Sequence, residues 1–212
     1  MALLTNHQTN LQARIEQLER RNQLLEAELD RLRVYKDYAY TDPLTEIPNR
    51  RFYYERLLQE IARARRGKHA LTLALLDLDL FKEVNDEVGH RGGDQVLKFF
   101  SQFLRVNLRQ EDVLCRIGGD EFAIILPDTN AEQAGIIFDR IRGKLDQIEI
   151  AIDGRFRIGL SFSCGVATFS PEYLPEDLIE EADHSLYSAK ARGRNRVVAA
   201  CLTEMMVSRA VH

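Results

Sequence analysis

The feature that most restricts the fold is an apolar run at residues 71–77 (LTLALLD), which ends in a carboxylate. An apolar run of this length is typical of a central strand that other elements cover on both faces. Apolar residues recur at helical spacing before this run, from 49 to 61, and after it, from 96 to 104. The run therefore predicts a mixed α/β domain built around one central sheet.

The remaining patterns set the order of the elements. Residues 113–117 and 122–126 flank Gly118-Gly119 and predict a hairpin whose glycines adopt positive φ. Gly92-Gly93-Asp94 precedes a helical stretch. Further along we expect a helix at 131–147, a turn at Asp153-Gly154, a long strand at 156–169, a helix at 176–192 and a short strand at 195–199. The order β-α-β-β-α-β predicts the ferredoxin-like split βαβ fold, in the α/β (α+β) class.

Residues 1–40 contain neither glycine nor proline, and their apolar residues recur at gaps of four and three. In a heptad register, position d holds Leu11, Leu18, Leu25 and Leu32, and position a holds Ile15, Asn22, Leu29 and Lys36. The g positions Arg14, Arg21 and Glu28 are opposite in sign to the e positions Glu19, Glu26 and Arg33. Matched charges and a single core asparagine favour a parallel two-stranded coiled coil, and hence a homodimer. The alternative is one amphipathic helix that lies on the domain.

Composition excludes several classes of protein. The 212 residues are 45% hydrophobic and 29% charged, with a net charge of −4, which gives no electrostatic basis for nucleic-acid or membrane-surface binding. No apolar run reaches the roughly 20 residues of a membrane span, and the N-terminus lacks a signal-peptide pattern. Three widely spaced cysteines favour a reducing compartment. We therefore expect a cytoplasmic protein, either complete or a portion of a longer one.

Asp42-Pro43 interrupts the N-terminal helical pattern, because proline removes a donor and restricts the residue before it. We expect a coiled-coil dimerisation helix at 1–40, a catalytic-type domain at 41–199 and a C-terminal tail at 200–212.

Acidic residues gather in two places. Asp77 is the last residue of the apolar run, and Asp120 and Glu121 follow the glycine turn. In a split βαβ sheet these strands are neighbours, so the acids are expected to converge and hold Mg²⁺, which takes a few carboxylates and leaves room for substrate phosphates. Lys190 and Arg194 would supply positive charge to such phosphates. Alternatively, the acids only cap a strand end and a turn, and the cations only complement a helix C-terminus.

Asn85 and Asp94 lie on either side of a glycine-rich bend, where both would face a purine. A carboxylate at 94 would accept from the guanine N1–H and N2–H₂ edge and would be left unpaired by adenine. His90 is expected to be structural. The pair therefore predicts a guanine site.

Five stretches together resemble the GGDEF diguanylate cyclase family, in order and over residues 41–199: DPLTEIPNRR, DLDLFKEVND, GHRGGD, IGGDEF and SLYSAKARGRNRV. The resemblance implies a nucleotidyl cyclase-like palm that condenses two GTP into cyclic di-GMP and releases two pyrophosphates. Glu46 and Leu80 depart from the family pattern, at positions outside this chemistry.

The resemblance also implies roles for residues. Ligands of Mg²⁺, with Mn²⁺ as an alternative ion, would be Asp77, the Leu78 carbonyl, Asp120 and Glu121. Either Asp120 or Glu121 would activate the 3′-hydroxyl, and the sequence leaves that choice open. Substrate contacts would come from Leu44, Phe81, Lys82, Asn85, Asp94, Gly118, Gly119, Lys190 and Arg194.

An R-x-x-D pattern, Arg109 to Asp112, ends five residues before the glycine turn. By resemblance it implies an inhibitory site for the product cyclic di-GMP, completed by Arg51 or another basic residue on a neighbouring domain. Alternatively, it is a polar loop between a helix and a strand. Two other functions remain open: a catalytically silent module that binds cyclic di-GMP, and a pure dimerisation adaptor.

Overall fold

The computed structural model describes residues 14, 15, 17–29, 31 and 39–200. The chain divides into two compact units, Met1–Tyr40 and Thr41–His212. Each is considered by itself.

The N-terminal unit is helical at residues 14, 15, 17–29 and 31. Its predicted core positions Ile15, Leu18, Leu25 and Leu29 are between 48% and 54% exposed in the single chain. Half-exposed apolar side chains at heptad spacing are what a coiled-coil strand shows before it pairs. Asn22, the polar core position, is also exposed. The remaining core positions, Leu11, Leu32 and Lys36, and Arg33 at position e, lie outside the described residues, so pairing into a dimer stays a prediction.

The second unit is built on a five-stranded sheet with the order β2-β3-β1-β6-β7. Its strands are β1 (Leu71–Leu78), β2 (Val113–Arg116), β3 (Glu121–Pro127), β6 (Phe162–Thr168) and β7 (Val197–Ala199). Strand β1 pairs antiparallel with both β3 and β6, whereas β6 and β7 are parallel. All eight residues of β1 are buried. The predicted central strand is therefore confirmed.

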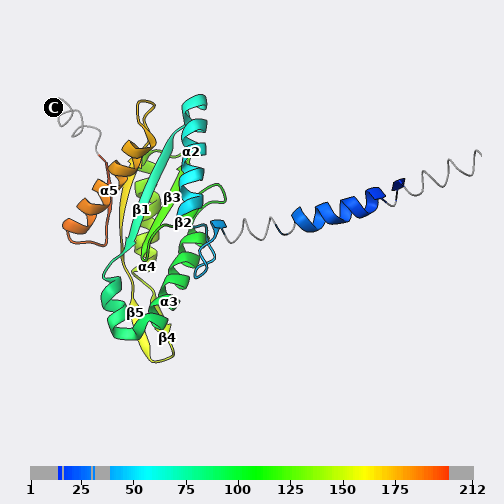
Figure 1. Ribbon diagram of the computed structural model, residues 1–212. Helices are drawn as coiled ribbons and strands as arrows, with labels where there is room; N and C mark the ends of the chain where they lie inside the picture. The colour runs from blue at the N-terminus through cyan, green and yellow to red at the C-terminus, as the bar shows by residue number, and fades with distance from the viewer. Residues whose placement is uncertain (1–13, 16, 30, 32–38, 201–212) are drawn as a thin grey trace, which may run out of the picture. The chain divides into compact units, whose positions relative to one another are not determined.

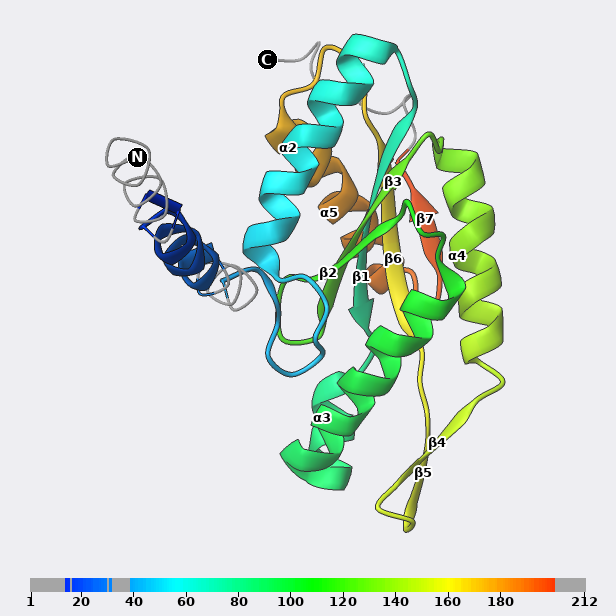
Figure 2. The same cartoon turned by 90° about the vertical axis from the view of Figure 1, so that its right-hand side faces the viewer.

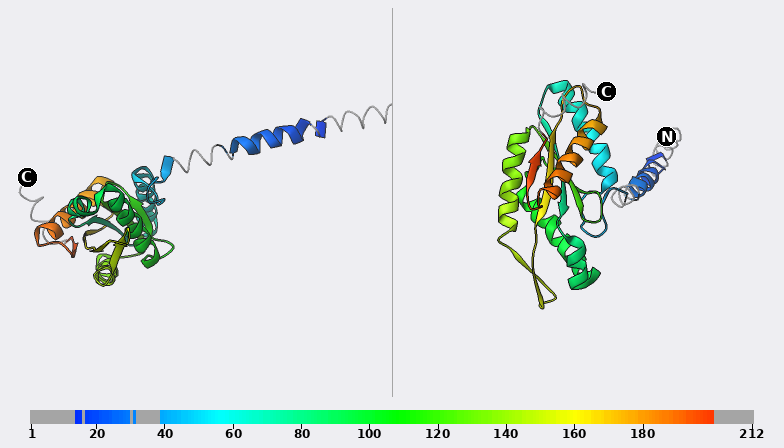
Figure 3. Two further views of the ribbon diagram at one scale, coloured as in Figure 1. Left: turned by 90° about the horizontal axis from the view of Figure 1, so that it is seen from below. Right: turned by 90° about the vertical axis from the view of Figure 1, so that its left-hand side faces the viewer.

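Two helices cover each face of this sheet (Figures 1 and 2). Helices α3 (Phe81–Asn107) and α4 (Ala131–Leu145) bury their apolar sides with Ala74, Leu76 and Leu78 of β1. Helices α2 (Arg50–Gly67) and α5 (Pro175–Ala191) pack with the alternate β1 residues Leu71, Leu73 and Leu75. The right-hand view of Figure 3 shows α5 crossing in front of the sheet. Since successive side chains of a strand point to opposite faces, Asp77 belongs to the α2/α5 face.

The chain order β1-α3-β2-β3-α4-β6 confirms the predicted split βαβ fold. The expected strand at 156–169, however, is wrong as one element. Strand β5 (Phe156–Gly159) pairs with β4 (Glu149–Ile152) in a separate hairpin, and β6 begins only at Phe162. The chain changes partner between them, and from Ser161 on it pairs with the β1 side, where the Ser161 carbonyl accepts a hydrogen bond from the Asp79 N–H (3.0 Å). The predicted turn at Asp153-Gly154 joins β4 to β5, with φ of 50° and 67°.

Helix α3 corrects a second expectation. The segment Gly92-Gly93-Asp94 lies inside the helix rather than before it, and the bend falls at Gly89 (φ 74°, ψ 167°). A Cβ at Gly93 would collide with the Asn85 side chain, and one at Gly92 would collide with Val88. These two glycines are therefore needed for close packing between the two halves of α3. Among the described residues, no helix combines the length and the apolar character needed to cross a bilayer.

Candidate active site

The predicted acids meet one of the predicted cations, Lys190, at the C-terminal end of β1. Lys190 lies in the last turn of α5, and its Nζ is 2.6 Å from Oδ2 of Asp77. Asp77 and Glu121 are directly opposite each other across β1 and β3. Residues opposite each other in an antiparallel pair share one face of the sheet, so both carboxylates belong to the side covered by α5.

The backbone brings the glycine turn against the same strand end. The Leu78 N–H donates to the Asp120 carbonyl (3.2 Å). In a strand the N–H and C=O of one residue point the same way, so the Leu78 carbonyl also faces the hairpin. This places the predicted oxygen donors Asp77, Leu78, Asp120 and Glu121 at one edge of the sheet.

The ionisation of Asp77 reflects these neighbours. Burial raises its pKa, the Lys190 ammonium lowers it, and the carboxylates of Asp120 and Glu121 raise it, with a net upward shift. A second cation near Asp77 would relieve the repulsion among the acids.

These donors suit a divalent ion by their chemistry, because hard carboxylate and carbonyl oxygens are the ligands that Mg²⁺ prefers. The described residues contain no group of three His, Cys, Asp or Glu side chains already gathered as a metal cluster. Lys190 instead contacts Asp77 directly. The donor set therefore fits an ion held partly by water and by substrate phosphates.

The glycine turn differs from the sequence-based expectation in its backbone. Neither Gly118 nor Gly119 adopts positive φ. Gly118 leaves space for the Glu121 carboxylate, which a Cβ at this position would force to move. Space around Gly119 is open. The turn is closed by the N–H groups of Ile117 and Gly118, which donate to the Glu121 carbonyl (2.9 and 3.3 Å).

Sequence reasoning missed the residue that braces this turn, Arg116. Its Nε and Nη2 donate to the Gly119 carbonyl (3.2 and 2.7 Å), and its Nη1 contacts Asp42 Oδ1 at 2.9 Å. Burial raises the pKa of Asp42, but hydrogen bonds from Thr45 and the Arg116 charge outweigh it and hold that pKa below its ordinary value. The spacing of Asp42 and Thr45, typical of a turn closed by a side chain, was the available signal. Leu44, in the same loop, packs against the core.

The residues predicted to bind guanine lie on α3. Phe81 begins the helix and packs against the core, whereas Lys82 is exposed. Asn85 is half-buried with its amide against Gly93, next to the exposed Asp94. The close packing at Gly93 therefore brings together two residues nine apart in the chain.

Arg194 follows α5 in a loop of unusual backbone. Gly193, Arg194 and Asn195 all have positive φ (108°, 61° and 43°). The Arg194 N–H donates to the Ala189 carbonyl (3.1 Å), and its side chain is exposed. The loop thus presents a guanidinium four residues beyond Lys190.

Arg109 and Asp112 form a tight turn between α3 and β2. The Arg109 N–H donates to Asp112 Oδ2 (2.8 Å), and the Asp112 N–H donates back to the Arg109 carbonyl (3.2 Å). The Arg109 side chain is exposed. Asp112 Oδ1 is buried without a hydrogen-bond partner among the described residues, and burial raises the Asp112 pKa in spite of Arg109.

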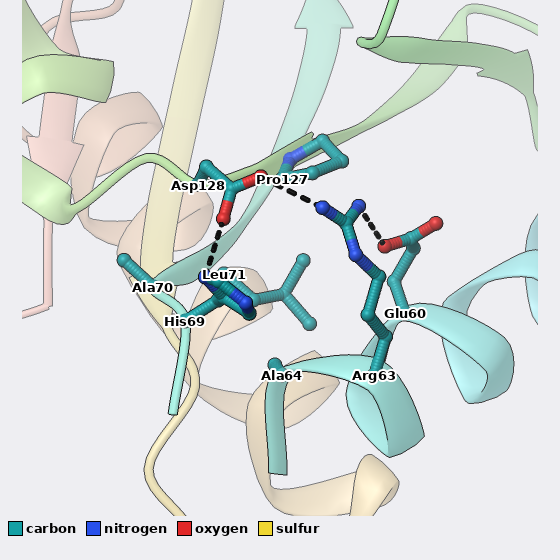
Figure 4. A pocket seen from close by; sticks show the side chains of 8 residues that line it. All are labelled: Glu60, Arg63, Ala64, His69, Ala70, Leu71, Pro127 and Asp128. Atoms are coloured by element: carbon teal, nitrogen blue, oxygen red, sulfur yellow. Dashed lines mark hydrogen bonds and ion pairs between the residues drawn. The ribbon is translucent and has the colours of Figure 1, made fainter. Parts of the chain in front are cut away.

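A shallow hollow at the opposite end of the sheet contains charges that no prediction used (Figure 4). Asp128 contacts Arg63 Nη2 (2.9 Å) and His69 Nδ1 (3.1 Å). Arg63 also contacts the buried Glu60 (3.3 Å). These charged groups pair with one another.

A split βαβ palm with oxygen donors and cations at the end of its central strand is the architecture of a nucleotidyl cyclase. The family model described as "Diguanylate cyclase, GGDEF domain" matches residues 39–196, and the chain belongs to this family. The predicted family resemblance is confirmed.

Curated relatives of the chain support the same family membership. Over 187 residues the chain is 39% identical to diguanylate cyclase DgcP of Pseudomonas aeruginosa, covering 88% of this chain and 28% of that protein. Over 158 residues it is 41% identical to diguanylate cyclase DosC of Escherichia coli K12, covering 74% of this chain and 34% of that protein. The chain thus spans roughly a third or less of the length of these curated relatives.

The fold is also similar to a solved structure, the coiled coil and GGDEF domain of DgcB from Caulobacter crescentus in complex with c-di-GMP. The TM-score is 0.78 at 32% identity, covering 86% of this chain and 99% of that one.

Proposed function

We propose that this protein is a diguanylate cyclase, which condenses two GTP into cyclic di-GMP and releases two pyrophosphates. The observation that carries the proposal is the meeting of Asp77, Glu121 and Lys190 at one strand end. Acids beside a cation can serve both a divalent ion and a triphosphate, and the family membership supports GTP as the substrate.

In the proposed mechanism, different residues bind the triphosphate, the guanine base and the divalent ion. Lys82, Lys190 and Arg194 bind the triphosphate, while Asn85 and Asp94 select guanine. Asp77, the Leu78 carbonyl and the acids of the turn hold Mg²⁺ or Mn²⁺, which when bound neutralises phosphate charge. Positioning and charge stabilisation supply most of the rate acceleration.

For the proton of the 3′-hydroxyl, the geometry favours Glu121 over Asp120. Glu121 is opposite Asp77, on the same face of the sheet, and is exposed. The adjacent Asp120 is half-buried and holds Leu78 through its carbonyl. We assign the 3′-hydroxyl proton to Glu121, and we assign Asp120 to the divalent ion and to the support of the turn.

Each 3′-hydroxyl attacks the α-phosphate of the other GTP, so two domains must meet with their sites face to face in a two-fold arrangement. We propose that the N-terminal helix forms a parallel homodimer and raises the effective concentration of the second domain. The half-exposed Ile15, Leu18, Leu25 and Leu29 support this role. Deleting residues 1–36 should lower specific activity and make it steeply dependent on concentration. Unchanged activity at nanomolar enzyme would contradict this.

We further propose that Arg109 and Asp112 bind cyclic di-GMP and inhibit the enzyme. The exposed Arg109 guanidinium suits a phosphodiester, and Asp112 fixes the backbone that carries it. Arg109→Ala should weaken product inhibition about tenfold, as expected for a lost charge-assisted hydrogen bond. Equal inhibition in variant and wild type would remove this part of the proposal. The cytoplasm, which supplies GTP and Mg²⁺, is the proposed compartment.

The activity itself is tested by incubating the protein with GTP and Mg²⁺ and resolving cyclic di-GMP by chromatography. We expect product from the wild type and none from Glu121→Gln. A protein that binds cyclic di-GMP but converts no GTP would be a silent binding module. A protein that does neither and still dimerises would be an adaptor.

A further inference from the structure

Asp79, two residues beyond Asp77, is a buried carboxylate that the proposed mechanism does not use. Only 7% of it is exposed. Its Oδ1 accepts from the Ser163 hydroxyl (2.6 Å), and its Oδ2 accepts from the Ser161 hydroxyl (2.8 Å). Among residues 39–200, no Lys, Arg or His side chain forms an ion pair with it. Neutral donors therefore satisfy this carboxylate.

The third donor to Asp79 comes from a distant part of the chain. The Asn195 N–H donates to Oδ2 at 2.9 Å, across 116 positions in sequence. Asn195 ends the loop in which Gly193, Arg194 and Asn195 all have positive φ. Asparagine tolerates a left-handed backbone, but arginine rarely adopts one, so the backbone at Arg194 is strained and persists where surrounding contacts hold it.

The contact acts directly on the peptide that joins Arg194 to Asn195, because the donor is the N–H of that peptide. Fixing this peptide plane fixes ψ of Arg194, and with it the direction in which the side chain leaves the loop. The preceding peptide, between Gly193 and Arg194, is tied to α5, because its N–H donates to the Ala189 carbonyl. Asp79 is thus the link between the end of β1, which carries Asp77, and the loop that carries Arg194.

We infer that Asp79 is a positioning residue for the phosphate site: it holds the 193–195 loop so that Arg194 reaches the same polyphosphate as Lys190. This inference rests on the proposed function. The Asp79 carboxylate already accepts three hydrogen bonds from protein donors, which gives it a positioning role rather than a place among the proposed metal ligands. Its role requires acceptor oxygens at that place rather than a negative charge.

The test measures the affinity of the full chain for 3′-deoxy-GTP, which lacks the attacking hydroxyl, and for GMP, both with Mg²⁺. The Arg194→Ala variant shows how far the preference for 3′-deoxy-GTP over GMP falls when the guanidinium itself is removed. Asp79→Ala should reproduce that loss, weakening 3′-deoxy-GTP binding about tenfold and GMP binding much less, because one guanidinium contact is mispositioned. Equal losses for both nucleotides would overturn the inference.

The double variant Asp79→Ala/Arg194→Ala should bind 3′-deoxy-GTP no more weakly than Arg194→Ala alone. Both substitutions remove the same interaction, that of the Arg194 guanidinium with the polyphosphate. Additive losses would show that Asp79 acts elsewhere and would also overturn the inference. The matched control is Thr72→Val, at the other end of β1, where a buried hydroxyl bonds the Thr129 carbonyl. It should lower the unfolding temperature without changing the preference for triphosphate.

Asp79→Asn keeps the inference testable if Asp79→Ala does not fold. Its amide oxygen can accept from the Asn195 N–H while its NH₂ donates to a serine hydroxyl. We expect wild-type Mg²⁺ dependence and 3′-deoxy-GTP affinity within about threefold, a small effect on the affinity scale. A raised Mg²⁺ requirement would identify Asp79 as a metal ligand and refute the inference. Failure of the wild type itself to bind 3′-deoxy-GTP would count against the proposed function instead.

Discussion

The two ends of the central strand β1 use acidic residues in opposite ways. At the Leu71 end, every carboxylate oxygen of Asp128 and Glu60 contacts a basic side chain, as Figure 4 shows for Arg63 and His69. At the other end, Asp77 contacts Lys190, but among residues 39–200 the side chains of Asp120 and Glu121 make no hydrogen bond or ion pair.

The difference indicates what each end is for. A carboxylate that finds its partners within the fold stabilises or orients local structure, and any net gain is small when the pair is exposed. Carboxylates that face one another without enough cations destabilise the fold, and they persist where an external ion or substrate completes them. Burial is the main cause of the raised pKa of Asp77, and the charges of Asp120 and Glu121 add to it in spite of the Lys190 ammonium.

The largest expected effect comes from removing a charge at the Lys190 end. Asp77→Asn should lower cyclic di-GMP synthesis about a thousandfold or more, because a metal and phosphate site loses an oxygen anion. Initial rates of product formation by chromatography measure this. Retention of a tenth of the wild-type rate would break the distinction between the two ends.

Guanine selection gives the next largest effect. Asp94→Asn should reduce the preference for GTP over ATP about a hundredfold, since the carboxylate no longer accepts from two guanine donors. Competition of ATP with 3′-deoxy-GTP binding measures it. Asp86→Asn, an exposed acid on the same helix, serves as the control and should leave the preference unchanged. An unaltered preference in Asp94→Asn would place guanine recognition elsewhere.

The pH dependence of stability sharpens the comparison. An aspartate with a raised folded pKa binds its proton more tightly when folded, so it lowers stability as pH rises from 3.8 through that folded pKa. The Asp77→Asn variant cannot ionise at this position, so it does not lose this stability as pH rises. The variant should therefore be more stable than wild type at neutral pH, and the difference should vanish below pH 3.8. Urea unfolding across pH measures it. A variant that is less stable at neutral pH would contradict the sign.

The smallest effect is expected at the Leu71 end. Asp128→Asn should lower the free energy of unfolding by about 0.5–1 kcal/mol, as for exposed ion pairs. It should leave cyclic di-GMP synthesis unchanged. Asparagine tolerates the left-handed backbone of Asp128 (φ 53°), so the loss would report the charge alone. Urea unfolding at neutral pH is the measurement, and a loss of activity would show that the two ends are coupled.

Local sequence patterns predicted most elements, including β1, α2, α4, α5 and the hairpin of β2 and β3. The helices show an apolar side at helical spacing, and β1, which is buried on both faces, is a continuous apolar run. The meeting of Asp77 with the turn acids was also predictable, since the order of strands makes β1 and β3 neighbours. The break between β5 and β6 was not predictable. Both halves alternate alike, and only the long-range choice of β4 or β1 as partner separates them.

The contacts that hold the site were also hidden from the sequence. The role of Arg116 depends on Asp42 and Gly119, and that of Asp79 on Asn195, all of which the tertiary fold brings together. Glycine at 118 was expected for positive φ, but what it provides is space beside the Glu121 carboxylate. Side-chain crowding of this kind leaves no periodic signal.

The most direct measurement is the affinity of the wild type for 3′-deoxy-GTP with and without Mg²⁺, beside Asp77→Asn and Glu121→Gln. The account predicts that Mg²⁺ strengthens binding at least about tenfold in the wild type, a gain of roughly 1.4 kcal/mol, and far less in either variant. Equal affinity in the wild type with and without the ion would contradict the claim that the acids of β1 and the hairpin share one divalent cation beside a guanine nucleotide.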